Sequence, residues 1–145
     1  MTTVLKTTEH NEAVTFSQTL DVLGIPHWHL SQELWTPSWG QKIKQKQEGF
    51  KKGLSDYLVY IPKEKSCVDR ALLVFIELKK PKKQLRRKST RGDAGEFVSQ
   101  SDPTMEQIEF INKINKVKDV QGFVCYGSVE AIEVVRKFLI QNNIS

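Results

Sequence analysis

The chain has 145 residues, of which 39% are hydrophobic and 27% are charged. This composition suits a single globular domain over residues 1–145, which buries about two-thirds of its unfolded surface. No apolar stretch approaches the roughly 20 residues of a membrane-spanning helix, and the first residues lack a signal peptide's apolar core. We therefore expect a cytoplasmic protein without a membrane partner. A net charge of +5 permits nucleic-acid binding but does not establish it. Cys67 and Cys125 lack the spacing of a disulfide framework or a zinc site.

The first predicted element is a helix from about Thr8 to Leu23, which Gly24 ends. On a helical wheel Glu9 falls at the middle of the apolar stripe and Glu12 near its edge. An acid at that position is either a functional group or a first-turn glutamate favoured by the helix dipole. The pattern alone leaves both interpretations open.

Two histidines, His27 and His29, alternate with apolar residues in a predicted short strand over Ile25–Ser31. They can share a metal ion, but no third ligand is near in sequence, which favours surface or core histidines.

The next segment, Leu34–Lys52, interleaves aromatic residues with basic residues. It suits either base stacking with phosphate binding or a solvated helix face anchored by tryptophan. Its bases are Lys42, Lys44, Lys46, Lys51 and Lys52.

Two apolar runs, Gly53–Pro62 and Leu72–Pro81, predict the strands of a hairpin. Strand alternation places Glu77 and Lys79 on one face of the second run, and Asp56 begins the first. Facing residues of a hairpin have a constant sum of positions, and setting Asp56 opposite Glu77 places the turn in the polar segment between the runs. Two adjacent carboxylates repel each other, and a divalent cation relieves the repulsion.

Residues 80–101 predict a mobile, basic loop that leaves directly from the acid pair. A loop this long in a compact domain is usually functional or disordered. It is therefore either a clamp on a nucleic-acid backbone or a solvated run of charge, and it cannot by itself specify a base sequence. Its bases are Lys80, Lys82, Lys83, Arg86, Arg87, Lys88 and Arg91.

The remaining elements are a helix, a strand and a helix. Asp102 and Pro103 predict the cap and first residue of a helix that has Gln107 near the centre of its apolar face, among Ile108, Phe110, Ile111, Ile114 and Val117. Gly122–Gly127 predicts a core strand. Ser128 is the predicted cap of a last helix, with Val129, Ile132, Val135, Phe138 and Leu139 facing inward, and 142–145 form a tail.

Four blocks in this order resemble the virus-type replication-repair nucleases, a family of the PD-(D/E)xK nuclease superfamily found in phages and in some DNA-repair enzymes. The blocks are KQEGFKKGLSDYLVYIP, LLVFIELKKPKK, TMEQIEFI and GFVCYGSVEAIEVVRKFL, and the resemblance extends from about Glu9 to Leu139. One departure is Ser55, where the family usually has proline before the aspartate. The resemblance implies a single α/β domain with a mixed β-sheet flanked by helices on both faces.

The resemblance also implies a Mg²⁺-dependent DNA endonuclease, with Mn²⁺ as a substitute and no organic cofactor. Asp56, Glu77, Glu9 and the Leu78 carbonyl would hold the metal, Lys79 would orient the attacking water or stabilise charge, and Gln107 would position water or phosphate. Glu9 is the first choice for the third acid, because its interval to Gly24 matches the family, and Glu12 is the reserve. Lys80 and the loop bases would hold the DNA backbone.

Family members of this size resemble structure-specific enzymes that act on branched DNA, such as Holliday junctions, as homodimers. The resemblance also implies a phage-encoded enzyme that works in the host cytoplasm. Flap cleavage, nicking and nonspecific degradation remain open. The alternatives from another class are a DNA-binding module whose nuclease site has decayed and an RNA-binding protein that uses the Trp and Lys segment. Either module would bind nucleic acid without a metal.

Overall fold

A computed structural model describes residues 8–30, 39–49, 53–81 and 102–141. Within these ranges the elements are, in order, α1 (Glu9–Val22), β1 (His27–His29), α2 (Trp39–Gln47), β2 (Tyr57–Ile61), the 3₁₀ turn η1 (Lys63–Lys65), β3 (Leu72–Lys79), α3 (Met105–Ile114), β4 (Val120–Tyr126) and α4 (Ser128–Lys137). No helix in this part of the chain is long and apolar enough to cross a membrane.

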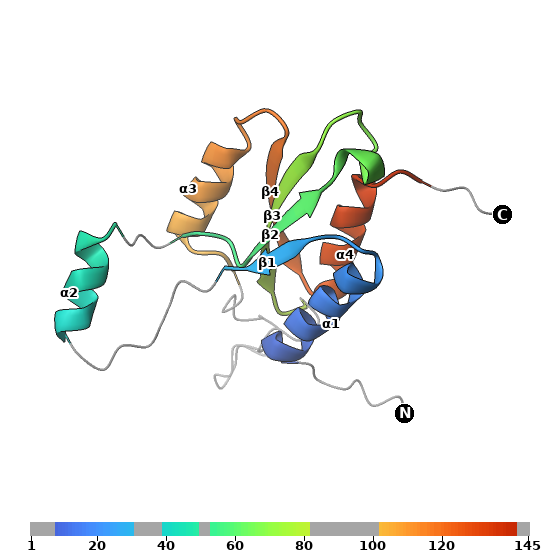
Figure 1. Cartoon of the computed structure of the whole chain (residues 1–145). Helices are drawn as coiled ribbons and strands as arrows, with labels where there is room; N and C mark the ends of the chain where they lie inside the picture. Colours follow the sequence, from blue (N-terminus) through green and yellow to red (C-terminus); the bar gives the residue numbers. More distant parts are fainter. Residues whose placement is uncertain (1–7, 31–38, 50–52, 82–101, 142–145) are drawn as a thin grey trace, which may run out of the picture.

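The strands form one mixed sheet in the order β1-β2-β3-β4. The first two pairings are antiparallel, while β3 and β4 run parallel because α3 carries the chain back between them. Helix α3 lies on one face of the sheet, and α1 and α4 lie on the other (Figure 1). The predicted α/β class, with a mixed sheet and helices on both faces, is confirmed.

The central hairpin has the predicted register. Tyr57 pairs with Ile76 and Ile61 with Leu72, so facing positions have the same sum as Asp56 and Glu77. The turn contains η1 and bends between Ile61 and Leu72, at the opposite end of the strands from the two acids. Cys67, in this turn, is exposed.

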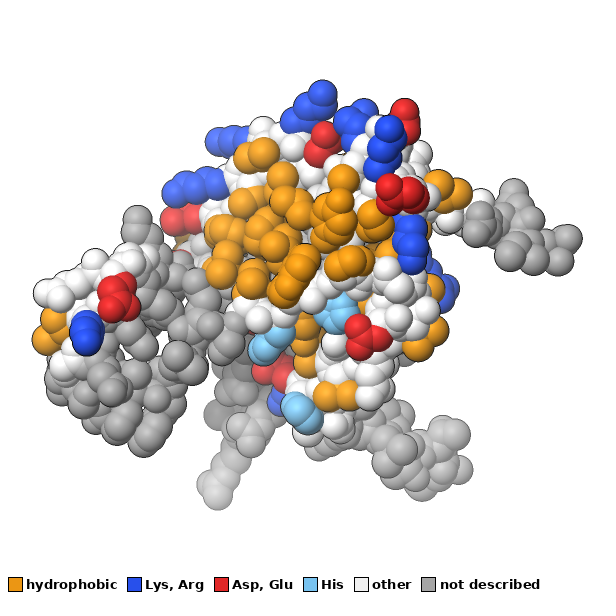
Figure 2. Space-filling view, viewed as in Figure 1, with side chains coloured by type: hydrophobic (Ala, Val, Ile, Leu, Met, Phe, Trp, Pro, Cys, Tyr) orange, Lys and Arg blue, Asp and Glu red, His pale blue; other side chains and the backbone are white. Residues whose placement is uncertain are grey.

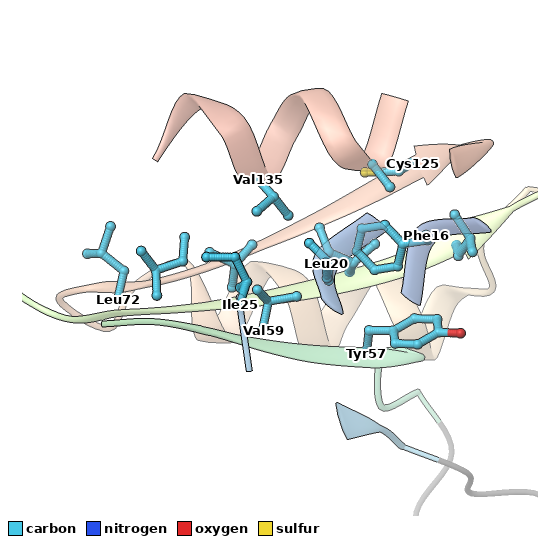
Figure 3. Close-up of a cluster of buried hydrophobic side chains, with 13 residues drawn as sticks. Phe16, Leu20, Ile25, Tyr57, Val59, Leu72, Cys125 and Val135 are labelled. Carbon is cyan, nitrogen blue, oxygen red and sulfur yellow. The ribbon is translucent and has the colours of Figure 1, made fainter. Parts of the chain in front are cut away.

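The core lies between the sheet and the α1–α4 layer. Figure 3 shows Phe16 and Leu20 of α1 lying over Tyr57 and Val59 of β2, with Val135 of α4 beside them. The rings of Phe16 and Tyr57 meet edge to face, with 5.2 Å between their centroids. This apolar burial fixes which face of the hairpin is internal and therefore which face carries the acids.

The start of α3 differs from the prediction. The N-cap is Thr104 rather than Asp102, and Pro103 precedes the helix. Thr104 Oγ1 accepts from the Gln107 backbone N–H and the Gln107 side chain accepts from the Thr104 N–H, which forms a capping box. Asp102 instead accepts a hydrogen bond from the Tyr126 hydroxyl at 3.2 Å.

Three residues that were predicted to face inward on the last two helices are exposed instead. Helix α3 ends at Ile114, so Val117 lies beyond it and is exposed, as is Ile108. Gly127 precedes α4 with a positive φ of 95°, where a side chain would be strained and would meet Pro81. Ser128 is therefore the first helical residue rather than the cap, and Val129 in the first turn is exposed.

Helix α2 is the described part of the predicted Trp and Lys segment. Ile43, Lys44 and Lys46 are exposed on it, and Figure 1 shows the helix apart from the sheet. The rest of that segment, most of the predicted basic loop (82–101) and the tail (142–145) lie outside the described residues.

Candidate active site

Asp56 and Glu77 lie on the same face of the hairpin at its open end. Leu58 pairs with Phe75, and the two acids are one strand period further along, where the register sets them opposite each other. Asp56 Oδ2 accepts a hydrogen bond from the Leu78 backbone N–H at 2.9 Å. The Asp56 carboxylate is therefore fixed against the end of β3.

Glu77 is a buried carboxylate whose two oxygens have different surroundings. Its residue exposure is 1%, and Oε1 lies 2.7 Å from Gln107 Nε2 and 3.1 Å from Lys79 Nζ. Oε2 is also buried and has no hydrogen-bond partner among the residues that the structure describes. A buried anionic oxygen without a partner is costly, so this atom is suited to receive a proton or a cation.

Burial raises the pKa of both carboxylates. Burial and the neighbouring Asp56 raise the pKa of Glu77 to about 7, although Lys79 acts in the opposite direction. Burial also raises the pKa of Asp56, against the lowering effect of the Leu78 N–H. A nearby cation stabilises the ionised form of such carboxyl groups.

The donor set fits a hard divalent ion held largely by water. Both side chains offer only oxygen ligands, and Mg²⁺ commonly binds through one or two carboxylates while keeping several waters. Across residues 8–30, 39–49, 53–81 and 102–141, no three His, Cys, Asp or Glu side chains form a metal-binding group. The pair of acids is therefore the side-chain donor set that this part of the chain provides.

The backbone of Leu78 also faces this site. A strand residue directs its N–H and C=O toward the same neighbour, and the Leu78 N–H points at Asp56. Its carbonyl oxygen therefore lies on the side where the predicted ligand role needs it. The Leu78 side chain is buried in the core.

Gln107 reaches the acids from α3. Its Oε1 accepts from the Thr104 N–H at 2.8 Å, which leaves Nε2 to donate to Glu77. The same amide therefore caps the helix and orients the carboxylate. The structure places Gln107 against Glu77 itself, whereas the sequence-based role was to position water or phosphate.

The two candidate third acids are in different surroundings. Glu9 is exposed in the first turn of α1, and its negative charge helps to raise the pKa of Asp56, but among the described residues it does not form one metal-binding group with Asp56 and Glu77. Glu12 is buried and accepts a hydrogen bond from the Ser128 N–H at 2.8 Å, at the start of α4. Glu12 thus links two helices, and Glu9 is the acid whose charge acts on Asp56.

The two histidines of β1 contact different parts of the structure. His27 has its Nε2 2.7 Å from the Ser17 hydroxyl and so joins β1 to α1. His29 pairs with Tyr57, with 4.9 Å between ring centroids, and a positive charge on it lowers the pKa of Asp56. Sequence reasoning missed His29 as a neighbour of the site, because the pairing of β1 with β2 was not predicted.

The predicted DNA-binding bases are only partly described. Lys80 is exposed directly after β3, and Lys44 and Lys46 are exposed on α2. The side chains of the others lie outside the described residues: Lys42, Lys51, Lys52, Lys82, Lys83, Arg86, Arg87, Lys88 and Arg91.

Comparisons of the chain with protein-family models, with curated proteins and with solved structures find no match.

Proposed function

We propose that this protein is a Mg²⁺-dependent deoxyribonuclease of the PD-(D/E)xK type. The observation that supports it most is the convergence of Asp56, Glu77 and Lys79 on one face at the open end of the hairpin. The element order supports it further, because helix, strand, hairpin, helix, strand and helix follow one another as the resemblance implies, with α2 as an addition.

Asp56, Glu77 and the Leu78 carbonyl would hold Mg²⁺, or Mn²⁺ in its place, and Glu9 would assist from α1. The bound ion would supply an activated water and neutralise charge at the scissile phosphate. The Oε2 of Glu77, which has no partner among the described residues, and the raised pKa values of both acids support this role.

Lys79 and Gln107 would organise the reacting groups. The Lys79 ammonium lies 3.1 Å from Glu77 Oε1, so it is placed beside the acid pair, where it can stabilise negative charge that develops on the phosphate. Gln107 keeps Glu77 in its orientation through the 2.7 Å hydrogen bond, which pre-organises the acid before DNA arrives.

The substrate we propose is DNA, held along its backbone by Lys80 and the neighbouring basic residues of the protein. Each phosphate contact makes binding more sensitive to salt. A homodimer with paired sites would match the symmetry of a branched, four-way substrate.

The test is cleavage of a panel that contains a four-way junction, a flap, a single strand, a plain duplex and an RNA, with Mg²⁺ and with chelator. Glu77→Ala and Lys79→Ala should each slow cleavage at least about a hundredfold, the size expected for loss of one charge-stabilising group. Glu109→Ala and Lys113→Ala, which remove exposed charges from α3, are the matched controls. Full Mg²⁺-dependent cleavage by Glu77→Ala would refute the proposal, and binding without cleavage would favour a nucleic-acid-binding module.

A further inference from the structure

The half of the acid-bearing sheet face that β1 and β2 form is not covered by α3. Trp28 pairs with Leu58, which pairs with Phe75, so these side chains share the face that carries Asp56 and Glu77. Helix α3 lies over the β3–β4 half of that face. There Phe110 meets Phe75 with 5.3 Å between ring centroids.

Among the described residues, two aromatic side chains are exposed on the half that α3 does not cover. Trp28 is 52% exposed and Tyr60 is 36% exposed, while Leu58 between them is half-buried. Figure 2 shows hydrophobic side chains gathered over the strands in the centre of the view. Aromatic faces on a sheet bind nucleobases by stacking, and the interaction tolerates any base sequence.

The exposed aromatic residues favour bases that have left a stack. Along β2, Asp56, Leu58 with its partner Trp28, and Tyr60 follow one another at two-residue steps, so both aromatic residues lie on the strands that lead to the acids. In a duplex the faces of each base are covered by its neighbours, so a base can lie on Trp28 or Tyr60 only after it has left the stack. An unpaired strand allows this, and an intact duplex does not.

We propose that Trp28 and Tyr60 form a stacking platform for unpaired nucleotides next to the cleaved bond. The inference rests on the proposed nuclease function and narrows its substrate to DNA with a single-stranded segment beside the site. Charge agrees with this occupant, because the chain carries +5 and the exposed Lys80 follows the acid-bearing end of β3.

The test measures binding without cleavage, by fluorescence anisotropy of a labelled oligothymidylate and of a blunt duplex, on the full chain in chelator. Trp28→Leu keeps an apolar side chain but removes the stacking face, so it should weaken oligothymidylate binding about tenfold. Trp28→Phe should stay within about threefold of wild type, because it keeps an aromatic face. Tyr60→Leu should also weaken this binding, and it tests the platform if Trp28→Leu fails to fold. Val22→Ala, a change at an exposed position on α1, is the control.

Unchanged oligothymidylate affinity in Trp28→Leu and Tyr60→Leu would overturn the platform. It would also be overturned if wild type sediments as a dimer, Trp28→Leu as a monomer, and both bind the oligonucleotide equally, because the face would then join two copies of the chain. The stacking-platform proposal and the nuclease proposal can be refuted separately. Trp28-dependent binding without Mg²⁺-dependent cleavage of any substrate would leave only the platform, and cleavage without Trp28-dependent binding would leave only the nuclease.

Discussion

At the scale of single residues, the protonation state of Glu77 decides whether the site can bind a cation. One of its oxygens is held by Gln107 and Lys79, and the other is buried without a partner in the described chain. Burial and the neighbouring Asp56 raise the pKa of Glu77 to about 7, so near neutral pH the metal-free carboxyl group is protonated in part of the molecules. Proton and cation therefore compete for the same atom.

This competition predicts a pH-dependent stability in the metal-free protein. The folded-state pKa of Glu77 is raised above its ordinary value of 4.5. The resulting stabilisation is complete below the unfolded-state pKa and is lost as pH rises through about 7. We expect the Tm in chelator to fall between about pH 5 and 8 more steeply in wild type than in Glu77→Gln, which has no titrating group at position 77. Parallel pH profiles for the two proteins would contradict this.

Mg²⁺ should offset that loss. An ion that binds the folded state and not the unfolded one raises stability by mass action. At about pH 8, where Glu77 is ionised, added Mg²⁺ should raise the Tm of wild type and leave that of Glu77→Gln nearly unchanged. A thermal melt with and without the ion measures the difference.

Ser55 carries a second buried oxygen without a partner in the described chain, directly before Asp56. A buried hydroxyl that makes no hydrogen bond costs its desolvation free energy. Ser55→Ala should therefore raise the free energy of unfolding, by less than about 1 kcal/mol, without loss of cleavage. Urea denaturation measures the stability, and a clear destabilisation would show that the hydroxyl has a partner.

At the scale of elements, the first turn of α3 joins helix capping to the site. Thr104 and Gln107 satisfy each other's backbone N–H groups, and Gln107 alone continues to Glu77. Two neighbouring residues thus share one structural role and differ in a functional one.

Thr104→Ala and Gln107→Ala therefore form a matched pair. Each removes one half of the capping box, and we expect each to cost about 1 kcal/mol of stability. Only Gln107→Ala frees Glu77, so only this variant should cleave DNA more slowly, by about tenfold to a hundredfold, at a temperature where both are folded. Equal cleavage by the two variants would mean that the amide acts only as a cap.

The sequence predicted the hairpin because two constraints agreed there. Apolar alternation fixed the faces of both strands, and the constant sum set Asp56 opposite Glu77. The caps were missed by one or two residues, because Asp102 and Ser128 are also good N-cap residues and only the folded contacts favour Thr104 and Gly127.

The effect of His29 on Asp56 could not be predicted from the chain. It depends on the pairing of a three-residue edge strand with β2, which no local pattern specifies. The exposure of Trp28 likewise depends on how far α3 extends across the sheet.

At the scale of the whole molecule, the charge is concentrated in a short part of the sequence. Residues 80–91 contain seven bases and no acid, in a chain whose net charge is +5. Replacing Lys83, Arg86, Arg87 and Lys88 with Ser lowers the net charge from +5 to +1. This change tests whether that segment holds DNA.

We expect this variant to bind DNA more weakly and with a flatter salt dependence. Each lost phosphate contact reduces the slope of log K against log salt by roughly 0.7 to 0.9. Replacing Lys113, Lys116, Lys118 and Lys137 with Ser makes the same change in net charge at exposed positions elsewhere and is the control. Equal slopes for the two variants would show that only overall charge matters.

The turn of the central hairpin offers a site for covalent labelling. Cys67 in that turn is exposed, at the end of the strands opposite Asp56 and Glu77, whereas Cys125 is buried and its thiol has a pKa of about 12. A maleimide reacts with an accessible thiolate, so it should attach one dye per native chain and two after denaturation. The natural sequence thus provides a fluorescent reporter whose attachment point lies away from the acids.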